Sequence, residues 1–377
     1  MAAIWALLTG EYPPQFGGVA DYTFLVAEAL AKSGDTVHVW SGPCPQSAPV
    51  LPGVNLHRLP DQFGPLGLIE LNRGLAAIPD AKVVVQYTPH AFGFKALNLP
   101  FALWLNQKRG RYSVMFHEVA YPFIPGQPYR HRILAHVTHL MARLIASQAS
   151  RIFISIQGWE SVLRQLVRRL PPCYWLPVPT NVARSPKFQD VEAIRNRIPS
   201  NARLIGHFGT YQGGIAKLLT SVLINLLSAD ASRMANLVGH GSDHFAFQLM
   251  QSYPRISGQL IATGALSAVD VASHLSACDL LVQPYPDGAC TRRGSLMAGL
   301  GLGLPIVTNL GKLSDKVFFE TDAVRLAVND SPQLMVSMVE ELLDNPLERK
   351  RLREAASRFY DRYCSVESVV RNMRKHI

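Results

Sequence analysis

The sequence predicts an α/β protein of two domains, each a parallel β-sheet covered by helices. The first observation is length, because 377 residues exceed the usual size of one domain. The second is the alternation of short apolar runs with helical periods along nearly the whole chain, which is typical of parallel sheets. The third is composition: 48% of the residues are hydrophobic and 17% are charged, which excludes a disordered chain.

The first domain is predicted to open with a strand over 3–10 and a helix within 17–35. The apolar residues of this helix recur at helical spacing, and Gly34 is its stop signal. A strand over 35–40 then completes a βαβ unit. The other elements predicted for this domain are strands over 81–90, 111–118 and 151–158 and a helix over 130–147.

A proline-rich, charged stretch at 178–200 interrupts this pattern and predicts a linker. We therefore expect an N-terminal domain over 1–180, a linker over 181–200 and a C-terminal domain over 201–377 with terminal helices. The strands predicted for the second domain are 203–209, 235–241, 259–264, 279–285, 304–309 and 323–328. Two such domains facing a central cleft would bind a ligand at the carboxyl ends of their strands.

Net charge and cysteine usage limit the binding partners and the cellular location that can be expected. The formal net charge of +10 favours anionic partners, such as phosphorylated small molecules or an acidic membrane surface. Nucleic acid is not expected, because the basic residues are dispersed and no nucleic-acid-binding module is recognised. The five cysteines form neither a C-x-x-C pair nor a zinc-ligand pattern. We therefore expect no metal site and a cytoplasmic location, with peripheral contact at the inner face of the membrane as an open alternative.

Four segments together resemble one enzyme family. They are "GEYPPQFGGVADYTFLVAEALAKSGDTVHVW" (10–40), "VGHGSDHF" (238–245), "LSACDLLVQPY" (275–285) and "GLPIVTN" (303–309). These segments resemble the family 4 glycosyltransferases, which are retaining enzymes of the two-Rossmann-domain architecture called GT-B. The resemblance implies a sugar donor activated by a nucleoside diphosphate, bound mostly by the C-terminal domain, and an acceptor bound by the N-terminal domain. It implies no cofactor or metal, and we expect the C-terminal helices to pack back toward the N-terminal domain.

The chain departs from that family at the donor site. The family usually carries two glutamates eight positions apart, and these positions fall on Cys290 and Ala298. It also holds the diphosphate with an arginine and a lysine after the first C-terminal strand, where Lys217 is the only cation here. If the chain binds a diphosphate, other residues must hold it.

The segment 282–309 supplies candidates for that task. Arg292 and Arg293 can contact phosphate oxygens bidentately and stabilise a leaving diphosphate. Asp287 could orient a sugar hydroxyl or a neighbouring arginine, so these three residues are the catalytic candidates in this domain. The alternative is an ordinary turn at Asp287 with one arginine in solvent.

Glycine turns complete the predicted donor pocket. Around the arginines, Gly288 and Gly294 would allow close backbone approach, and Ser295 is expected to be the N-cap of the next helix. Strand-to-helix turns in both domains add the candidates Gly17, Gly18, Gly209, Thr210, Gly239, His240 and Gly241. The alternative for each glycine is a plain tight turn. No G-x-G-x-x-G follows the first strand of either half, which disfavours a dinucleotide-dependent oxidoreductase.

The N-terminal domain offers polar residues at strand ends. His117 matches a family histidine that contacts the transferred sugar, and is therefore a catalytic candidate. Asp21, His90 and Glu118 are expected to bind the acceptor, with Glu118 also a polar partner or base for His117. A satisfied structural histidine and a helix-dipole carboxylate are the alternatives.

The leading hypothesis is a metal-independent, retaining glycosyltransferase with a glycan, lipid-linked or small-molecule acceptor. The missing glutamates leave open a noncatalytic protein of the same fold that binds a sugar or nucleotide in a glycan assembly pathway. A nucleotide-sugar epimerase is the third hypothesis.

A basic face on the helix over 130–147, which contains Arg132 and Arg143, would contact solvent or anionic lipid.

Overall fold

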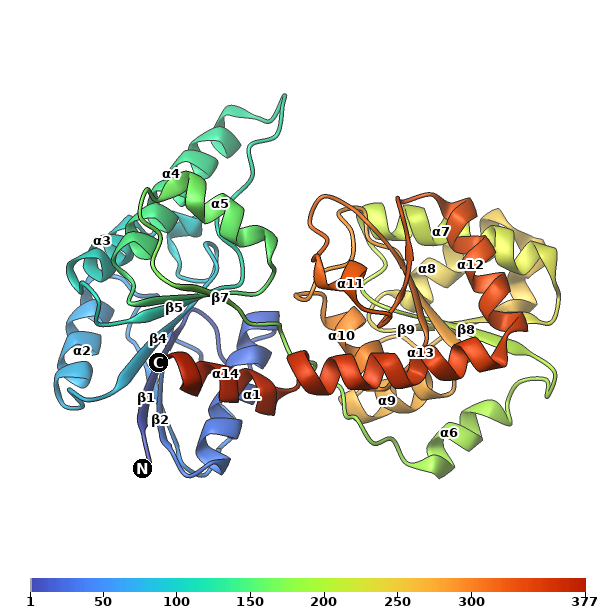
Figure 1. The fold of residues 1–377 in the computed structure, drawn as a ribbon, viewed down its shortest axis with the longest axis horizontal. Helices are drawn as coiled ribbons and strands as arrows, with labels where there is room; N and C mark the ends of the chain where they lie inside the picture. Colours follow the sequence, from blue (N-terminus) through green and yellow to red (C-terminus); the bar gives the residue numbers. More distant parts are fainter. Residues whose placement is uncertain (1) are drawn as a thin grey trace. The chain divides into compact units, whose positions relative to one another are not determined.

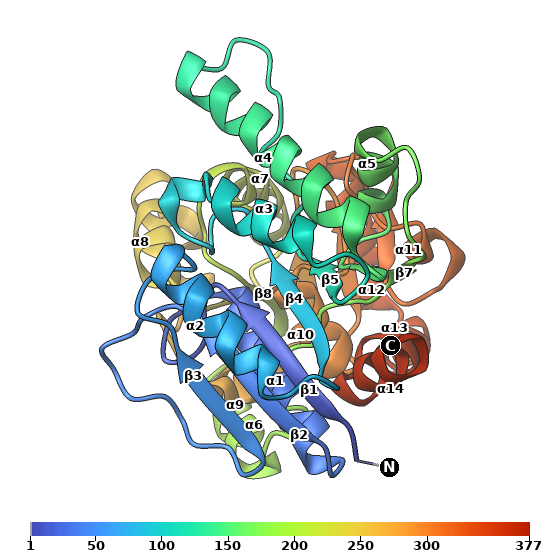
Figure 2. The same ribbon diagram turned by 90° about the vertical axis from the view of Figure 1, so that its left-hand side faces the viewer.

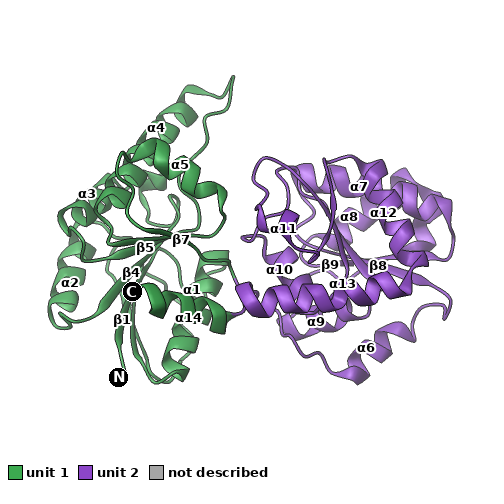
Figure 3. Ribbon diagram, viewed as in Figure 1, with its two compact units in different colours: residues 1–178, 366–377 green, residues 179–365 purple. Residues whose placement is uncertain are grey.

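The structure is a computed structural model that describes residues 2–377 and divides the chain into two compact units (Figure 3). The first unit runs to Val178 and also takes in Val366–Ile377. The second unit is the continuous stretch Pro179–Ser365. The last helix therefore belongs to the first unit rather than to the predicted domain 201–377. The predicted linker 181–200 contains a helix of the second unit.

The first unit is built on a seven-stranded parallel sheet with the strand order β3-β2-β1-β4-β5-β6-β7. Its strands are β1 (Ile4–Thr9), β2 (Thr36–Ser41), β3 (Val54–Arg58), β4 (Lys82–Tyr87), β5 (Ser113–Phe116), β6 (Arg151–Ile154) and β7 (Cys173–Trp175). All neighbouring strands pair in parallel. Five of them match the predicted strands. The edge strands β3 and β7 were not predicted, because one is mostly half-exposed and the other has only three residues.

Helices cover both faces of this sheet (Figures 1 and 2). Successive residues of a strand point to opposite faces, so Trp5 and Leu7 pack under α1 (Gly18–Lys32) and α14 (Val366–His376). Ala6 and Leu8 belong to the core on the other face. That core is closed by α2 (Pro65–Ala76), α3 (Leu99–Gln107), α4 (Tyr129–Gln148) and α5 (Gly158–Leu166), and a short turn, η1 (Phe94–Ala96), precedes α3.

The second unit repeats the design with six parallel strands in the order β10-β9-β8-β11-β12-β13. The strands are β8 (Arg203–Phe208), β9 (Arg233–Val238), β10 (Leu260–Ala262), β11 (Leu280–Gln283), β12 (Ile306–Asn309) and β13 (Arg325–Ala327). One face carries α7 (Gly213–Ala229), α8 (Ser242–Ser252) and α12 (Pro332–Asp344), and the other carries α9 (Ala268–Ser276), α10 (Gly294–Gly301) and α13 (Pro346–Phe359) (Figure 1). Shorter or peripheral elements are α6 (Phe188–Arg195), α11 (Val317–Glu320), η2 (Pro254–Gln259) and the π-helical turn η3 (Tyr360–Cys364).

Two parallel sheets wrapped by helices confirm the predicted α/β class and its two Rossmann-like halves. In each sheet the strand order reverses beside the first strand, between β1 and β4 and between β8 and β11. Such a reversal opens a crevice at the carboxyl ends of the strands, which is where open α/β sheets bind ligands. No helix within residues 2–377 is long and apolar enough to cross a membrane.

Candidate functional site

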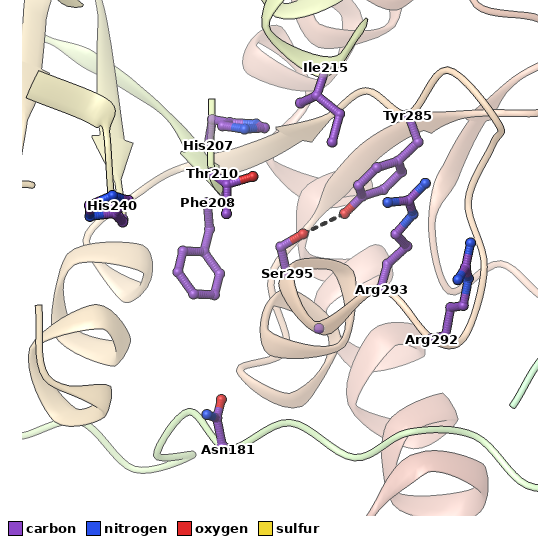
Figure 4. A pocket seen from close by; sticks show the side chains of 13 residues that line it. Asn181, His207, Phe208, Thr210, Ile215, His240, Tyr285, Arg292, Arg293 and Ser295 are labelled. Atoms are coloured by element: carbon purple, nitrogen blue, oxygen red, sulfur yellow. Dashed lines mark hydrogen bonds between the residues drawn. The ribbon is translucent and has the colours of Figure 1, made fainter. Parts of the chain in front are cut away.

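A cavity of about 410 Å³ lies in the second unit at the carboxyl ends of β8, β9 and β11 (Figure 4). It adjoins the reversal of strand order, and its size suits part of a nucleotide. Eight residues predicted from sequence line it: Gly209, Thr210, Gly239, His240, Arg292, Arg293, Gly294 and Ser295. Asn181, His207, Phe208, Ile215 and Tyr285 complete the lining, and none of them had been assigned to the site.

The two arginines share one carboxylate. The Arg293 guanidinium forms an ion pair with Asp287, and Nη2 of Arg292 lies 3.8 Å from Oδ2 of the same residue. Arg293 also stacks over the ring of Tyr285, at 4.9 Å from the ring centroid. Two guanidiniums against one carboxylate leave this wall of the cavity with a net positive charge. All three side chains are between one fifth and one quarter exposed, so the charge is partly shielded from solvent.

The N-terminus of α10 opens onto the same cavity. Its N-cap residue is Arg293, which makes no capping hydrogen bond with its side chain. Ser295 was predicted to be the N-cap but lies one residue inside the helix, where its hydroxyl hydrogen-bonds with the hydroxyl of Tyr285 at 2.8 Å. The first amides of α10 and the helix dipole therefore lie beside two cations, an arrangement that favours an anion.

The glycines of the predicted site have different tasks. Gly288 has φ +90°, and a Cβ on it would lie 2.3 Å from the amide nitrogen of Gly311, so it allows two loops to cross rather than lining the cavity. Gly239 has φ +114°, and its Cβ would lie 2.6 Å from the carbonyl oxygen of Gly209. Gly241 lines an adjoining hollow with Thr210 and His240. Glycine at 239 thus lets two turns of the cavity wall approach each other.

Two buried polar residues from distant parts of the sequence hold the arginine-bearing loop. The Asn309 side chain accepts from the Tyr285 amide at 2.8 Å and donates to the Tyr285 carbonyl at 2.7 Å. Asp315 accepts from the amide and the hydroxyl of Thr291, at 2.6 and 2.7 Å. Both residues are fully buried. These bonds fix the loop that carries Arg292 and Arg293, which keeps the two guanidiniums in place.

His207 forms a neutral part of the wall. Its Nδ1 donates to the Val282 carbonyl at 2.8 Å, so Nε2 carries the lone pair. Burial lowers the pKa of His207 to about 4, because charge is disfavoured away from water. The positive charge of this cavity at neutral pH therefore comes from arginine and not from this histidine.

The positions at which the family carries its two glutamates are buried here and are not open to a ligand. Cys290 and Ala298 are fully buried, and burial raises the pKa of the Cys290 thiol. Lys217 is exposed and does not line the cavity. The arginine pair thus supplies the cationic wall in this unit.

In the first unit, the glycine turn before α1 already contains an anion. A Cβ on Gly17 would lie 2.2 Å from Oε1 of Glu11, whereas a Cβ on Gly18 would meet nothing within 4 Å. The Glu11 carboxylate accepts from the Ala20 amide at 3.3 Å in the first turn of α1. Asp21 lies in the same turn, half-buried. A carboxylate of the chain itself therefore already lies at this helix N-terminus, beside the predicted donor residue Gly17.

His117 follows β5 and is buried. Its Nε2 donates to Oε1 of Gln86 at 3.0 Å, and its ring meets the edge of the Tyr22 ring with centroids 4.6 Å apart. Burial lowers the pKa of His117 to about 3, so the imidazole is neutral at physiological pH. The Ser155 hydroxyl and the Trp159 indole both donate to the His117 carbonyl, at 2.9 and 3.1 Å.

His90 and Glu118, two of the predicted acceptor residues, lie together at the ends of β4 and β5. Nδ1 of His90 is 3.8 Å from Oε2 of Glu118, and both approach the Thr88 hydroxyl, at 3.3 and 3.5 Å. The side chains of His90 and Glu118 are both more than one third exposed. This polar group could hydrogen-bond sugar hydroxyls. Within residues 2–377 no three His, Cys, Asp or Glu side chains are grouped to hold a metal ion.

Comparison with known proteins gives a fold and no sequence family. No family profile and no curated protein matches the sequence. Among solved structures, sucrose-phosphate synthase from Thermosynechococcus elongatus covers 99% of this chain and 98% of its own, at 16% identity and a TM-score of 0.74. WaaG, a glycosyltransferase involved in lipopolysaccharide biosynthesis, covers 98% of both chains at 16% identity and a TM-score of 0.67. Anabaena HepE, solved with UDP-glucose, covers 99% of this chain and 98% of its own at 14% identity and a TM-score of 0.66. The chain therefore has the GT-B fold found in these glycosyltransferases.

Proposed function

We propose that the protein is a retaining glycosyltransferase that moves a sugar from a nucleoside diphosphate to an acceptor hydroxyl without a metal ion. One observation carries the proposal: Arg292, Arg293 and the uncapped N-terminus of α10 meet in a single cavity. The glycine turns after β8 and β9 line the same cavity. Cations and amide donors held in place suit a diphosphate, whose negative charge grows as it leaves the sugar. That the GT-B neighbour HepE was solved with UDP-glucose supports the choice of donor.

In this proposal the arginines act on the leaving group. Arg292 and Arg293 bind diphosphate oxygens, while Asp287 keeps the guanidiniums oriented. The acceptor hydroxyl gives its proton to a departing phosphate oxygen. His117 does not act as a cationic acid, because it is neutral and its Nε2–H is already bonded to Gln86. Catalysis then rests on positioning and on stabilising the leaving diphosphate.

The acceptor is proposed to bind to the first unit, at His90, Glu118 and Asp21. The exposed pair His90 and Glu118 offers both donor and acceptor groups to sugar hydroxyls. A glycan, a lipid-linked sugar or a small sugar would satisfy this chemistry. We also propose a cytoplasmic location, because all five cysteines are free.

The deciding test is calorimetric titration with a panel of nucleoside diphosphates and their sugars, without added metal. Binding of one nucleotide should fall at least about 100-fold in the triple variant Arg292→Gln/Arg293→Gln/Asp287→Asn, because two charge-assisted contacts are removed. Replacing Asp287 as well avoids leaving its carboxylate unpaired. The matched control is Arg168→Gln/Arg169→Gln, which removes two exposed arginines from the first unit.

The rival functions give different outcomes when turnover of the bound donor is followed with and without an acceptor. A noncatalytic binding protein would bind a nucleotide or sugar but release no nucleoside diphosphate with any acceptor. An epimerase would convert the donor sugar when no acceptor is present. Unchanged nucleotide binding in the triple variant would overturn the assignment of this cavity as the donor site.

A further inference from the structure

One segment of the first unit exposes large apolar side chains that do not belong to its hydrophobic core. The loop 121–128 and the N-terminal turns of α4 project from the rest of this unit (Figures 1 and 2). The exposed apolar residues are Phe123 (51%), Ile124 (54%), Tyr129 (74%), Ile133 (43%) and Leu140 (44%). We call residues 121–143 the α4 tip. Such a concentration of exposed apolar area on one projection marks a contact surface.

The exposed residues form one stripe along α4. Tyr129, Ile133, His136, Leu140 and Arg143 are separated by four, three, four and three residues, so a helix places them on one face. The opposite face of the helix is buried in the core of the unit, through Ala135, Thr138, Met141, Ala142, Ile145 and Ala146. The helix therefore buries one apolar face in the unit and exposes a second face on which Tyr129, Ile133 and Leu140 alternate with polar residues.

The preceding loop extends this stripe. The Phe123 ring lies against the rings of His136 and His139, with centroids 4.9 and 4.8 Å apart. A hollow of about 430 Å³ beneath the loop is lined by Phe123, Ile124 and Arg132 together with residues 125–127. An apolar hollow with a guanidinium in its wall suits a group that joins hydrocarbon to phosphate.

Charge indicates what covers the tip. Arg130 and Arg132 are exposed and flank the stripe on its two sides. Residues 119–159 contain no acidic side chain. The longer stretch 81–159 contains nine lysine or arginine residues and one acidic residue, Glu118, so it holds +8 of the net charge of +10. A basic, acid-free segment with an apolar stripe complements an anionic, partly apolar surface.

We propose that the α4 tip docks the first unit onto a membrane containing anionic phospholipid. The stripe enters the boundary between headgroups and acyl chains, while Arg130 and Arg132 contact lipid phosphates at its two sides. A nucleic acid offers phosphates but no apolar layer for Ile133 and Leu140, so it fits this surface less well. The proposal goes beyond the transferase assignment and does not depend on it.

The test is cosedimentation of the full chain with vesicles, in the absence of donor and acceptor. One vesicle set is phosphatidylcholine alone, and the other contains phosphatidylglycerol as well. We expect binding to the anionic vesicles that weakens as salt rises. Arg130→Gln/Arg132→Gln should weaken it on the order of 30-fold, because each basic residue near an anionic surface contributes about fivefold. Phe123→Ser/Ile124→Ser should weaken it on the order of tenfold or more, because less apolar area enters the lipid.

Matched variants make the result specific to the tip. Arg168→Gln/Arg169→Gln removes the same charge elsewhere in the first unit, and Phe188→Ser removes an exposed ring in the second unit. Both controls should bind vesicles like the parent chain. Equal loss in the charge control, or no binding to anionic vesicles at low salt, would overturn the proposal. A third result would also overturn it: the parent chain does not bind vesicles, and a tip variant has a different oligomer mass in light scattering. The stripe would then be a contact between two copies of the chain.

Discussion

Two strand–turn–helix corners of this protein have similar sequence patterns but differ in the side chains that lie at the helix N-terminus. Each is a strand, a turn containing glycine and a helix, at Gly17–Gly18 in the first unit and at Arg293–Gly294 in the second. In the first, the Glu11 carboxylate reaches the first turn of α1. In the second, α10 starts with no capping side chain at its N-cap and two arginines beside it. A glycine turn thus predicts an available helix end, but a side chain from elsewhere decides whether a ligand can use it.

The largest expected effect comes from the strongly buried histidine that each unit places near its strand ends, His117 and His207. Burial lowers the pKa to about 3 for His117 and about 4 for His207. An unfolded histidine binds its proton near pH 6.5, so between pH 6.5 and about 4 the unfolded state binds more protons and folding stability is lost as pH falls. At pH 4 each histidine should lower the free energy of unfolding by an amount on the order of 3 kcal/mol.

Denaturant unfolding at pH 7 and pH 4 measures this loss. His117→Gln should reduce the acid sensitivity of the first unit, followed through its tryptophans. His90→Gln, which replaces an exposed histidine of the same unit, is measured alongside it. An identical pH dependence in the parent and in His117→Gln would contradict the neutral, buried assignment.

The next effect sharpens the role assigned to Asp287 in the second corner. If Asp287 only orients the arginines, Asp287→Asn should leave diphosphate affinity equal or up to about tenfold tighter, because a negative charge next to the anion is removed. Arg293→Gln should weaken affinity by roughly 10-fold to 100-fold. Titration with the nucleotide that binds the parent chain decides between them. Weaker binding of the sugar nucleotide but not of the free diphosphate in Asp287→Asn would instead indicate that Asp287 contacts the sugar.

A smaller effect should distinguish the adjacent glycines of the first corner. Gly17→Ala would place a Cβ against the Glu11 carboxylate and force that side chain away from α1, at a cost of about 1 kcal/mol in unfolding free energy. Gly18→Ala meets open space and should change stability little. Thermal unfolding of the two variants provides the comparison. Equal stability of the two would mean that Glu11 can move away from the helix end without loss.

The smallest effect is that of the Glu11 charge itself. Glu11→Gln keeps the shape of the side chain but removes the anion from the N-terminus of α1, so stability should fall by about 0.3–1 kcal/mol. The loss should shrink as salt is added, because the helix-dipole interaction is screened. Addition of phosphate should restore part of the stability of the variant if the vacated corner then binds an anion. If neither salt nor phosphate changes the stability difference between Glu11→Gln and the parent chain, the electrostatic explanation is wrong.

The fold was largely predictable, because buried parallel strands leave continuous apolar runs such as 3–10 and 81–90. The strand β3 was missed because its exposed edge carries Asn55 and His57 among its apolar residues. The helix α6 was hidden in a charged stretch with no buried residue to give it an apolar face. The family resemblance implied that the C-terminal helices pack back toward the N-terminal domain, and α14 does join the first unit. The sequence pattern alone could not show this, because an amphipathic pattern shows that a helix buries one face but not against which sheet.

The lining of the candidate site was predictable where several functional side chains are adjacent in the sequence. Adjacent arginines before a helix stood out in the sequence, and both line the cavity. Asn309 and Asp315 were missed, because their bonds to the arginine-bearing loop span 24 residues and follow no motif. Asn181 and Ile215 lacked any signal, since a cavity wall uses whatever side chain the fold brings there. The tasks of Gly288 and Ser295 depended on a neighbouring loop and a neighbouring hydroxyl, neither of which local sequence reveals.

The position of α14 has a consequence for how the protein is made. The second unit is continuous in sequence, so a ribosome delivers all of it before the first unit is complete. Until then, the sheet face that later receives Val369, Val370 and Met373 is covered by α1 but not by α14, and buried Asp35 lacks Arg374 as its cation. The unit synthesised first must therefore wait for Val366–Ile377, which follow the whole second unit. Removing Val366–Ile377 would leave its core open on one side, so the first unit should be captured by chaperones and proteases while the second still folds.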